Sequence, residues 1–249
     1  MRGVMEFIML YRSIAMMMVS LALLSCDEGS AELPNTQADT TTAEQGDGGG
    51  TALRIQGMGD SALDWNESKS SVSMLGTLLK AKGVSAYVEN NAVSGATMGC
   101  GEDGIGDAAN CVPPQYKQGQ WDYVILSGGA NDIGDSDCQH SADLFVSPDL
   151  KSGLTVAVVD DLVKKGAKVL LYSYFLARDA DHPLMKCDQV VLLLKRYKAL
   201  AENRPAVTLV DASEVIKPAQ TQLYAEDGIH PSPAGSKVIA EHIVSLLGH

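Results

Sequence analysis

From residue 51 onward, segments with a strand-like pattern of apolar residues alternate with segments in which apolar residues have helical spacing. Short runs rich in Val, Ile, Leu and Tyr predict strands, whereas apolar positions at helical spacing predict helices. The predicted strands lie at residues 52–58, 84–90, 121–129, 168–175 and 206–213. The predicted helices lie at residues 70–83, 154–166, 187–203 and 232–248. This alternation predicts a three-layer α/β/α domain with a five-stranded parallel sheet covered on both faces.

The first 25 residues have a different pattern from the rest of the chain. Arg2 and Arg12 precede the apolar stretch SIAMMMVSLALL, which has the length of a signal-peptide core and is too short to span a bilayer comfortably. The stretch ends in LLSC, which resembles the lipobox of bacterial lipoproteins and implies that Cys26 is lipidated and becomes the mature N-terminus. Leu24 is unusual in that motif, so an ordinary secretory signal or a free Cys26 is the alternative.

Residues 26–50 contain almost no large apolar side chain and are rich in Thr, Gly, Asp and Glu. Such a composition does not offset the entropy of ordering, so we expect a flexible tether that leads to one folded domain at residues 51–249. The predicted location is the bacterial cell envelope, either the periplasm or the cell surface. The pattern carries no signal for an oligomeric state.

Acidic residues outnumber basic ones by 31 to 19, for a net charge of -12. Loss of the first 25 residues would remove Arg2, Arg12 and Glu6 and leave a net charge of -13. Such a surface repels nucleic acid and anionic lipid. We therefore expect no nucleic-acid partner, and membrane contact only through the lipid anchor.

The predicted domain contains four cysteines, which fits an exported protein in a compartment that permits disulfides. The ten residues between Cys100 and Cys111 favour a disulfide between these two, which leaves Cys138 with Cys187 among the three pairings that four cysteines allow. A metal site would need a tight cluster such as Cys-x-x-Cys with nearby histidines, and the sequence has none. We expect no metal and no organic cofactor.

Polar residues follow the predicted strands at the edge where ligands bind in parallel α/β sheets. Ser61 follows the first strand, SGGAND at 127–132 follows the third, and DGIH at 227–230 precedes the last helix. Because the carboxyl ends of parallel strands meet at one edge, we expect these three segments to converge.

Four short blocks in the chain carry a more specific signal. GDS at 59–61, the glycine at 95 in NAVSGATM, GGAND at 128–132 and DGIHPSPAG at 227–235 resemble, in order, the four blocks of the SGNH hydrolases, also called the GDSL esterase and lipase family. The resemblance covers essentially the whole predicted domain, with Ala62 where the family name implies leucine. It implies the flavodoxin-like fold of that family and a serine esterase.

The reaction needs a base, because a serine hydroxyl is a weak nucleophile until its proton is removed. His230 is the candidate base for Ser61, and Asp227 is placed to accept a hydrogen bond from the other ring nitrogen. The resemblance implies an oxyanion hole made of the backbone N–H groups of Ser61 and Gly95 and the side-chain amide of Asn131. Asp60 and Asp132 are expected to hold the loops beside these residues.

Each of these residues also has an ordinary structural interpretation. Ser61 is a candidate helix cap, Asp227 a turn residue and His230 a solvated loop histidine. Their joint occurrence in four ordered blocks favours the catalytic interpretation.

The substrate class is less well defined by the sequence, which allows a small-molecule ester, a lipid or an acetylated glycan. Aromatic residues make up only 5% of the chain, which favours a small pocket over a long stacking groove and hence short to medium acyl groups. We expect the cysteine-bearing insertions at 99–118 and 134–150 to form the pocket rim. The alternatives are a carbohydrate O-acetylesterase and a ligand-binding lipoprotein without activity on the same scaffold.

Overall fold

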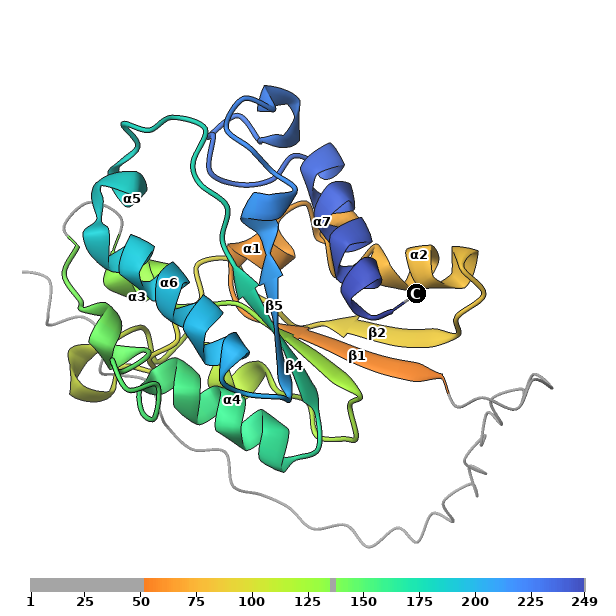
Figure 1. The fold of residues 1–249 in the computed structure, drawn as a ribbon, viewed down its shortest axis with the longest axis horizontal. Helices are drawn as coiled ribbons and strands as arrows, with labels where there is room; N and C mark the ends of the chain where they lie inside the picture. Colours follow the sequence, from red (N-terminus) through yellow and green to blue (C-terminus); the bar gives the residue numbers. More distant parts are fainter. Residues whose placement is uncertain (1–51, 135–137, 249) are drawn as a thin grey trace, which may run out of the picture. The chain divides into compact units, whose positions relative to one another are not determined.

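A five-stranded parallel sheet forms the centre of the domain (Figure 1). The computed structural model describes residues 52–134 and 138–248, so the predictions about the signal peptide, Cys26 and the tether lie outside the described residues. The strands pair in the order β2-β1-β3-β4-β5, all parallel, which is the flavodoxin-like order. The predicted α/β/α fold is confirmed. The strands are β1 Leu53–Met58, β2 Ala86–Asn90, β3 Tyr123–Leu126, β4 Lys168–Ser173 and β5 Val207–Asp211.

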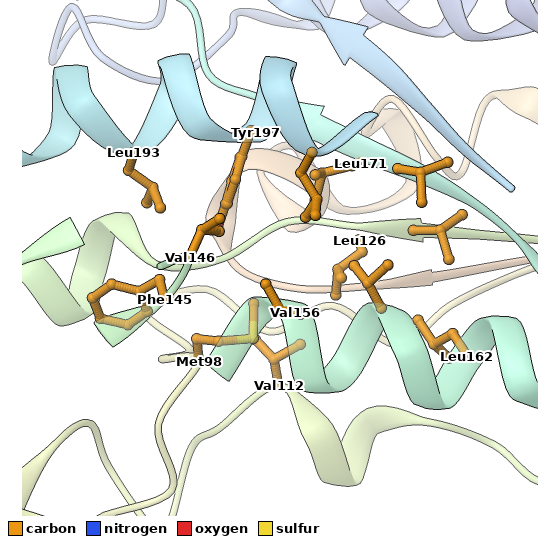
Figure 2. Close-up of a cluster of buried hydrophobic side chains, with 14 of the residues drawn as sticks. Met98, Val112, Leu126, Phe145, Val146, Val156, Leu162, Leu171, Leu193 and Tyr197 are labelled. Atoms are coloured by element: carbon orange, nitrogen blue, oxygen red, sulfur yellow. The ribbon is translucent and has the colours of Figure 1, made fainter. Parts of the chain in front are cut away.

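Helices cover both faces of the sheet and bury its alternating side chains. Helices α2 (Leu75–Ala81) and α7 (Pro233–Leu246) pack on one face, and α4 (Leu154–Lys164) and α6 (Asp188–Glu202) pack on the other. Ile125 of β3 belongs to the first core, whereas its neighbours in the strand belong to the second, as the period of two requires. Figure 2 shows that second core, with sheet residues Leu126 and Leu171 between the two helices. Within the described residues, no helix combines the length and the apolar run that crossing a bilayer requires.

The sequence pattern did not predict three single-turn helices, which are α1 (Ser61–Asp64), α3 (Ala130–Ile133) and α5 (Pro183–Lys186). Four residues are too few to show a helical period, so only the structure reveals them. The predicted helix at 70–83 is also shorter than expected. It begins at Leu75 because residues 71–74 form turns, and the Ser70 hydroxyl accepts a hydrogen bond from the Ser73 backbone N–H at 3.2 Å.

Two disulfides fix the segments that follow the second and third motif blocks. Cys100 is bonded to Cys111 and Cys138 to Cys187, the pairing that the cysteine spacing favours. The second bond joins the insertion after α3 to the start of α6.

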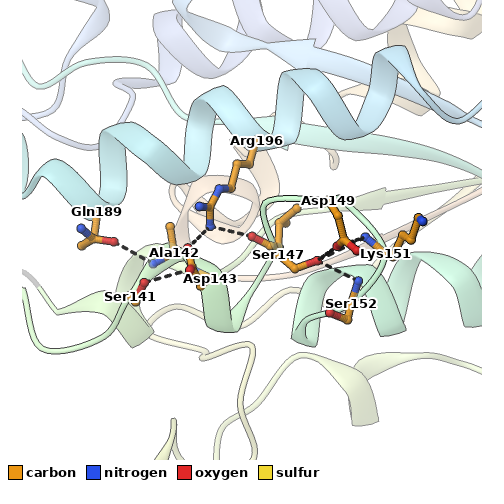
Figure 3. A network of polar contacts seen from close by, with 10 residues as sticks. Ser141, Ala142, Asp143, Ser147, Asp149, Lys151, Ser152, Gln189 and Arg196 are labelled. Carbon is orange, nitrogen blue, oxygen red and sulfur yellow. Dashed lines mark hydrogen bonds and ion pairs between the residues drawn. The ribbon is translucent and has the colours of Figure 1, made fainter.

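Polar contacts hold the same insertion against α6 (Figure 3). Arg196 of α6 donates to the Val146 carbonyl at 2.7 Å and forms an ion pair with Asp143 at 2.5 Å. Gln189 of α6 accepts a hydrogen bond from the Ala142 backbone N–H at 3.0 Å. The insertion is therefore bound along the side of α6.

Candidate active site

Ser61 opens α1 at the carboxyl end of β1, after a tight turn. Gly59 in that turn has φ +151°, and a Cβ there would lie 2.1 Å from the Ser127 hydroxyl oxygen, so only glycine fits. Asp60, not Ser61, caps α1, because its carboxylate accepts from the Ala62 backbone N–H at 3.0 Å. The Ser61 hydroxyl instead lies 2.8 Å from Nε2 of His230.

The other ring nitrogen of His230 faces Asp227, with Nδ1 2.7 Å from Oδ2. Asp227 Oδ1 accepts from the backbone N–H groups of Ile229 and His230 at 3.0 Å each, which fixes the carboxylate in its loop. An ionised carboxylate only accepts, so Nδ1 carries the ring proton and the Nε2 lone pair faces Ser61. A continuous hydrogen-bonded line thus joins Ser61, His230 and Asp227.

The Asp227 carboxyl favours its ionised form. Partial burial raises its pKa, but the backbone and ring N–H groups of His230 and the backbone N–H of Ile229 more than offset burial. Its pKa therefore lies below the ordinary value, and the carboxylate is charged near neutral pH.

Asn131 and Gly95 lie beside the serine. Asn131, in α3, donates from Nδ2 to the Ala96 carbonyl at 2.8 Å, which places its amide next to Gly95. Gly95 has φ +78°, a conformation that other residues rarely adopt. Among the residues described, the backbone N–H groups of Ser61 and Gly95 have no hydrogen-bond acceptor in the protein. Ser61, Gly95, Asn131 and His230 line one cavity.

Asp60 lies buried beneath the serine in a small polar network. Its Oδ1 accepts from the Ser127 hydroxyl at 2.8 Å, its Oδ2 accepts from the Tyr174 hydroxyl, and its own N–H donates to Ser127 at 3.0 Å. Burial raises the pKa of this carboxyl, and the hydrogen bonds from Tyr174, Ser127 and Ala62 oppose that rise only in part. The network ties the turn before Ser61 to the ends of β3 and β4.

Asp132 holds the segment that follows Gly95. Its two oxygens accept from the backbone N–H groups of Met98 at 2.7 Å and Gly99 at 2.8 Å. Burial raises the pKa of this carboxyl despite both hydrogen bonds. Because Asp132 adjoins Asn131, the same helix positions the side-chain amide and the Gly95 segment.

The wall of the cavity does not come from the cysteine-bearing insertions. Its volume is about 360 Å³, and no described residue of 99–118 or 134–150 lines it. The prediction that these insertions form the pocket rim is therefore wrong for the described residues. The second insertion is instead bound along α6. The segment after β4 supplies the wall instead, through Phe175, Ala177, His182 and Leu184.

Trp65 and Tyr174 near the site were missed by sequence reasoning, and Ser127 was expected at this edge but without its contact to Asp60. Trp65 stacks on the ring of His230, and Ser127 and Tyr174 hydrogen-bond to Asp60. Trp65 alone had a local signal, as one of two tryptophans in the chain and only four residues after Ser61. Across residues 52–134 and 138–248, no group of three or more His, Cys, Asp or Glu is placed to hold a metal ion.

Comparison with known proteins gives a family match. The model of the GDSL-like lipase/acylhydrolase family matches residues 55–238. No curated protein matches the chain.

Solved structures provide further comparisons. A lipase/acylhydrolase from Enterococcus faecalis is 20% identical, with a TM-score of 0.59 over 78% of this chain and 95% of that one. A variant of an acetyl xylan esterase from Geobacillus stearothermophilus is 21% identical, with a TM-score of 0.58 over 80% and 96%. A candidate SGNH hydrolase from Slackia heliotrinireducens is 22% identical, with a TM-score of 0.54 over 80% and 100%. At these identities the likeness shows a shared fold.

Proposed function

This chain belongs to the GDSL-like lipase/acylhydrolase family, and from that premise we propose that it is a serine esterase that forms an acyl-enzyme on Ser61. The observation that carries the proposal is the line of hydrogen bonds from Ser61 through His230 to Asp227, at 2.8 Å and 2.7 Å. That line opens into a cavity that also contains Gly95 and Asn131.

Acylation begins when the Ser61 hydroxyl oxygen attacks the ester carbonyl carbon while its proton passes to His230 Nε2. The carbonyl π electrons move to oxygen, and the resulting tetrahedral oxyanion accepts hydrogen bonds. When the oxyanion collapses, the bond to the leaving alkoxide breaks, and His230 returns the proton to it. Asp227 stabilises the imidazolium between these two transfers because its carboxylate is ionised.

Deacylation repeats the sequence with water as the nucleophile. His230 removes a proton from the water as its oxygen attacks the acyl carbon, and the bond to Ser61 then breaks. The proton on His230 returns to the Ser61 oxygen, and the carboxylic acid leaves. Free enzyme is regenerated with no net change in its protonation.

Three donors support the oxyanion in this proposal. The backbone N–H groups of Ser61 and Gly95 have no acceptor among the described residues and remain available to substrate. The Asn131 amide has two hydrogens and uses one on Ala96, which leaves the second for the oxyanion. The bond to Ala96 orients the amide before substrate arrives, which is the condition for strong electrostatic stabilisation.

The cavity supports short to medium acyl groups as the preferred substrates. Phe175, Ala177, Leu184 and Ile229 give it apolar walls, and its volume of about 360 Å³ is at the small end of the range for ligand pockets, which favours short and medium acyl groups.

A carbohydrate O-acetylesterase is the second candidate. Two polar residues, Ser94 and His182, line the same cavity, which suits an alcohol that carries further hydroxyl groups. One structural neighbour, the protein from Geobacillus stearothermophilus, is named as an acetyl xylan esterase and so has an activity of this class. A non-catalytic binding lipoprotein is less well supported, because binding alone does not require the hydrogen-bonded Ser61, His230 and Asp227.

The deciding experiment is hydrolysis of p-nitrophenyl esters from acetate to palmitate, and of acetylated xylooligosaccharides, by the disulfide-bonded protein beside Ser61→Ala. We expect turnover of short and medium esters that disappears in the variant. Release of acetate from the oligosaccharide alone would favour the second candidate. Binding of either ligand without turnover by folded protein would favour the binding lipoprotein.

We also propose that the protein is exported and anchored through a lipid on Cys26, supported by the LLSC motif at the end of the apolar leader. Mass spectrometry of the mature N-terminus tests this proposal. A lipid-modified Cys26 is expected, and an unmodified mature N-terminus in the soluble fraction would contradict it.

A further inference from the structure

Trp65 lies flat against the ring of His230, a contact that the proposed chemistry does not use. The two ring centroids are 3.7 Å apart and the planes differ by 6°. Trp65 follows α1 directly, and its backbone N–H donates to the Ser61 carbonyl at 2.9 Å. One turn of chain therefore presents both a hydroxyl to the edge of the imidazole and an indole to its face.

Asn66 fixes this indole relative to the histidine loop. Its side-chain amide donates to the Pro231 carbonyl and to the Ser236 hydroxyl, both at 2.9 Å. Pro231 follows His230, and Ser236 lies in the first turn of α7. Asn66 also has φ +75°, a left-handed conformation that turns the chain sharply after the tryptophan. Both hydrogen bonds bridge segments about 170 residues apart in sequence.

We propose that Trp65 is a positioning residue for His230 and that Asn66 holds it in place, an inference that rests on the proposed esterase function. The hydrogen bonds to Ser61 and Asp227 hold the two edges of the imidazole, but both lie close to the ring plane and resist tilting weakly. The indole face blocks that tilt on one side. It also lies against the imidazolium that forms during acylation, and a cation on a tryptophan face is stabilised.

This role differs from that of an ordinary pocket wall. Trp65 also lines the cavity, so a wall residue alone would affect mainly substrate binding and hence KM. A residue that positions the base affects mainly kcat, because imidazolium forms only on the way to the transition state. Asn66 separates the two roles, since it is not among the described residues that line the cavity, and its side-chain amide donates to Pro231 after His230 and to Ser236 of α7.

The test combines kinetics and NMR on Trp65→Leu, Trp65→Phe and Asn66→Gly. The glycine variant tolerates the left-handed backbone and removes only the side-chain amide. Trp121→Leu is the matched control, because Trp121 is the other tryptophan of the chain and contacts Tyr87 and Arg54 away from the cavity. The Cε1–H resonance of His230 reports the stacking directly, since an indole face shifts it upfield whether or not the protein turns over an ester.

We expect Trp65→Leu to lower kcat by about 2-fold to 30-fold, the range of a lost cation–aromatic contact. The KM of Trp65→Leu should stay within about 3-fold of the wild-type value. Trp65→Phe should keep most of the wild-type kcat, and the kcat of Asn66→Gly should lie between those of Trp65→Leu and Trp65→Phe. The upfield shift should be present in wild type, lost in Trp65→Leu and weakened in Asn66→Gly, with no change in Trp121→Leu.

Two results would overturn the proposal. The first is an unchanged kcat in Trp65→Leu, or a change in KM alone, because either means that the indole is only a wall. The second is a His230 resonance without an upfield shift in wild type, because the ring is then not held against Trp65. If wild type hydrolyses no ester while the shift is present, the esterase function fails separately and a role in base positioning falls with it.

Discussion

Replacement of Asp132 by alanine should destabilise the domain and disturb the proposed oxyanion site together. The carboxylate accepts from the Met98 and Gly99 backbone N–H groups at 2.7 Å and 2.8 Å, and Asp132 is only 5% exposed. The variant would leave both donors buried without a partner. Each such donor costs about 1 to 3 kcal/mol, so we expect a loss of about 2 to 6 kcal/mol in the free energy of unfolding.

The same loss should reduce activity, because Met98 and Gly99 anchor the segment that begins at Gly95. Urea unfolding followed by circular dichroism, with the disulfides intact, measures the stability change, and kcat is measured on folded protein. Asp107→Ala is the matched control, since that carboxylate also accepts a backbone N–H, from Ala109 at 2.8 Å, but in an exposed turn. We expect the control to change stability by less than about 0.5 kcal/mol. Equal stability of the two variants would refute the reasoning.

Three further outcomes follow from the site and the cross-links. Asn131→Ala should lower kcat by about 100-fold to 1000-fold with little change in the unfolding midpoint, in steady-state kinetics paired with urea unfolding. Replacing both cysteines by serine should lower the free energy of unfolding by about 4 kcal/mol at Cys138–Cys187 and by about 3 kcal/mol at Cys100–Cys111, because the first bond closes a loop of 49 residues and the second a loop of 11. Equal losses, or a larger loss at Cys100–Cys111, in urea unfolding would count against this. The pKa of Asp227 is lower in the folded protein than in the unfolded chain, so the ionised carboxylate stabilises the fold at pH values above the unfolded-state pKa. That stabilisation is lost as the pH falls through the folded-state pKa. The stability gap between wild type and Asp227→Asn in thermal unfolding should therefore narrow on acidification.

The sheet and the four motif blocks could be predicted because they depend on local patterns. Runs such as Tyr123–Leu126 are apolar on both faces, which is typical of a central parallel strand. The carboxyl ends of parallel strands then bring Ser61, after β1, and Asn131, after β3, to one edge, and the loop between β5 and α7 brings His230 to the same edge.

The cavity wall and the stacked tryptophan could not be predicted, because they depend on long-range contacts. The wall residues between 175 and 184 belong to the segment after β4, whose course is set by its own contacts. One of these is the hydrogen bond from the Ala177 backbone N–H to the Met185 sulfur at 3.4 Å. Trp65 stacks on His230 across 165 residues of sequence, and the next residue, Asn66, has a left-handed conformation and bonds to Pro231. No local periodicity encodes either arrangement.

The central claim is that Ser61 is the nucleophile and His230 activates it. Intact-mass and peptide mass spectrometry after treatment with diethyl p-nitrophenyl phosphate, a reagent that phosphorylates activated serines, tests it most directly. We predict a single adduct on Ser61 that is absent from Ser61→Ala and forms far more slowly in His230→Ala. No adduct on folded protein, an adduct at another residue, or an equal rate without His230 would contradict it.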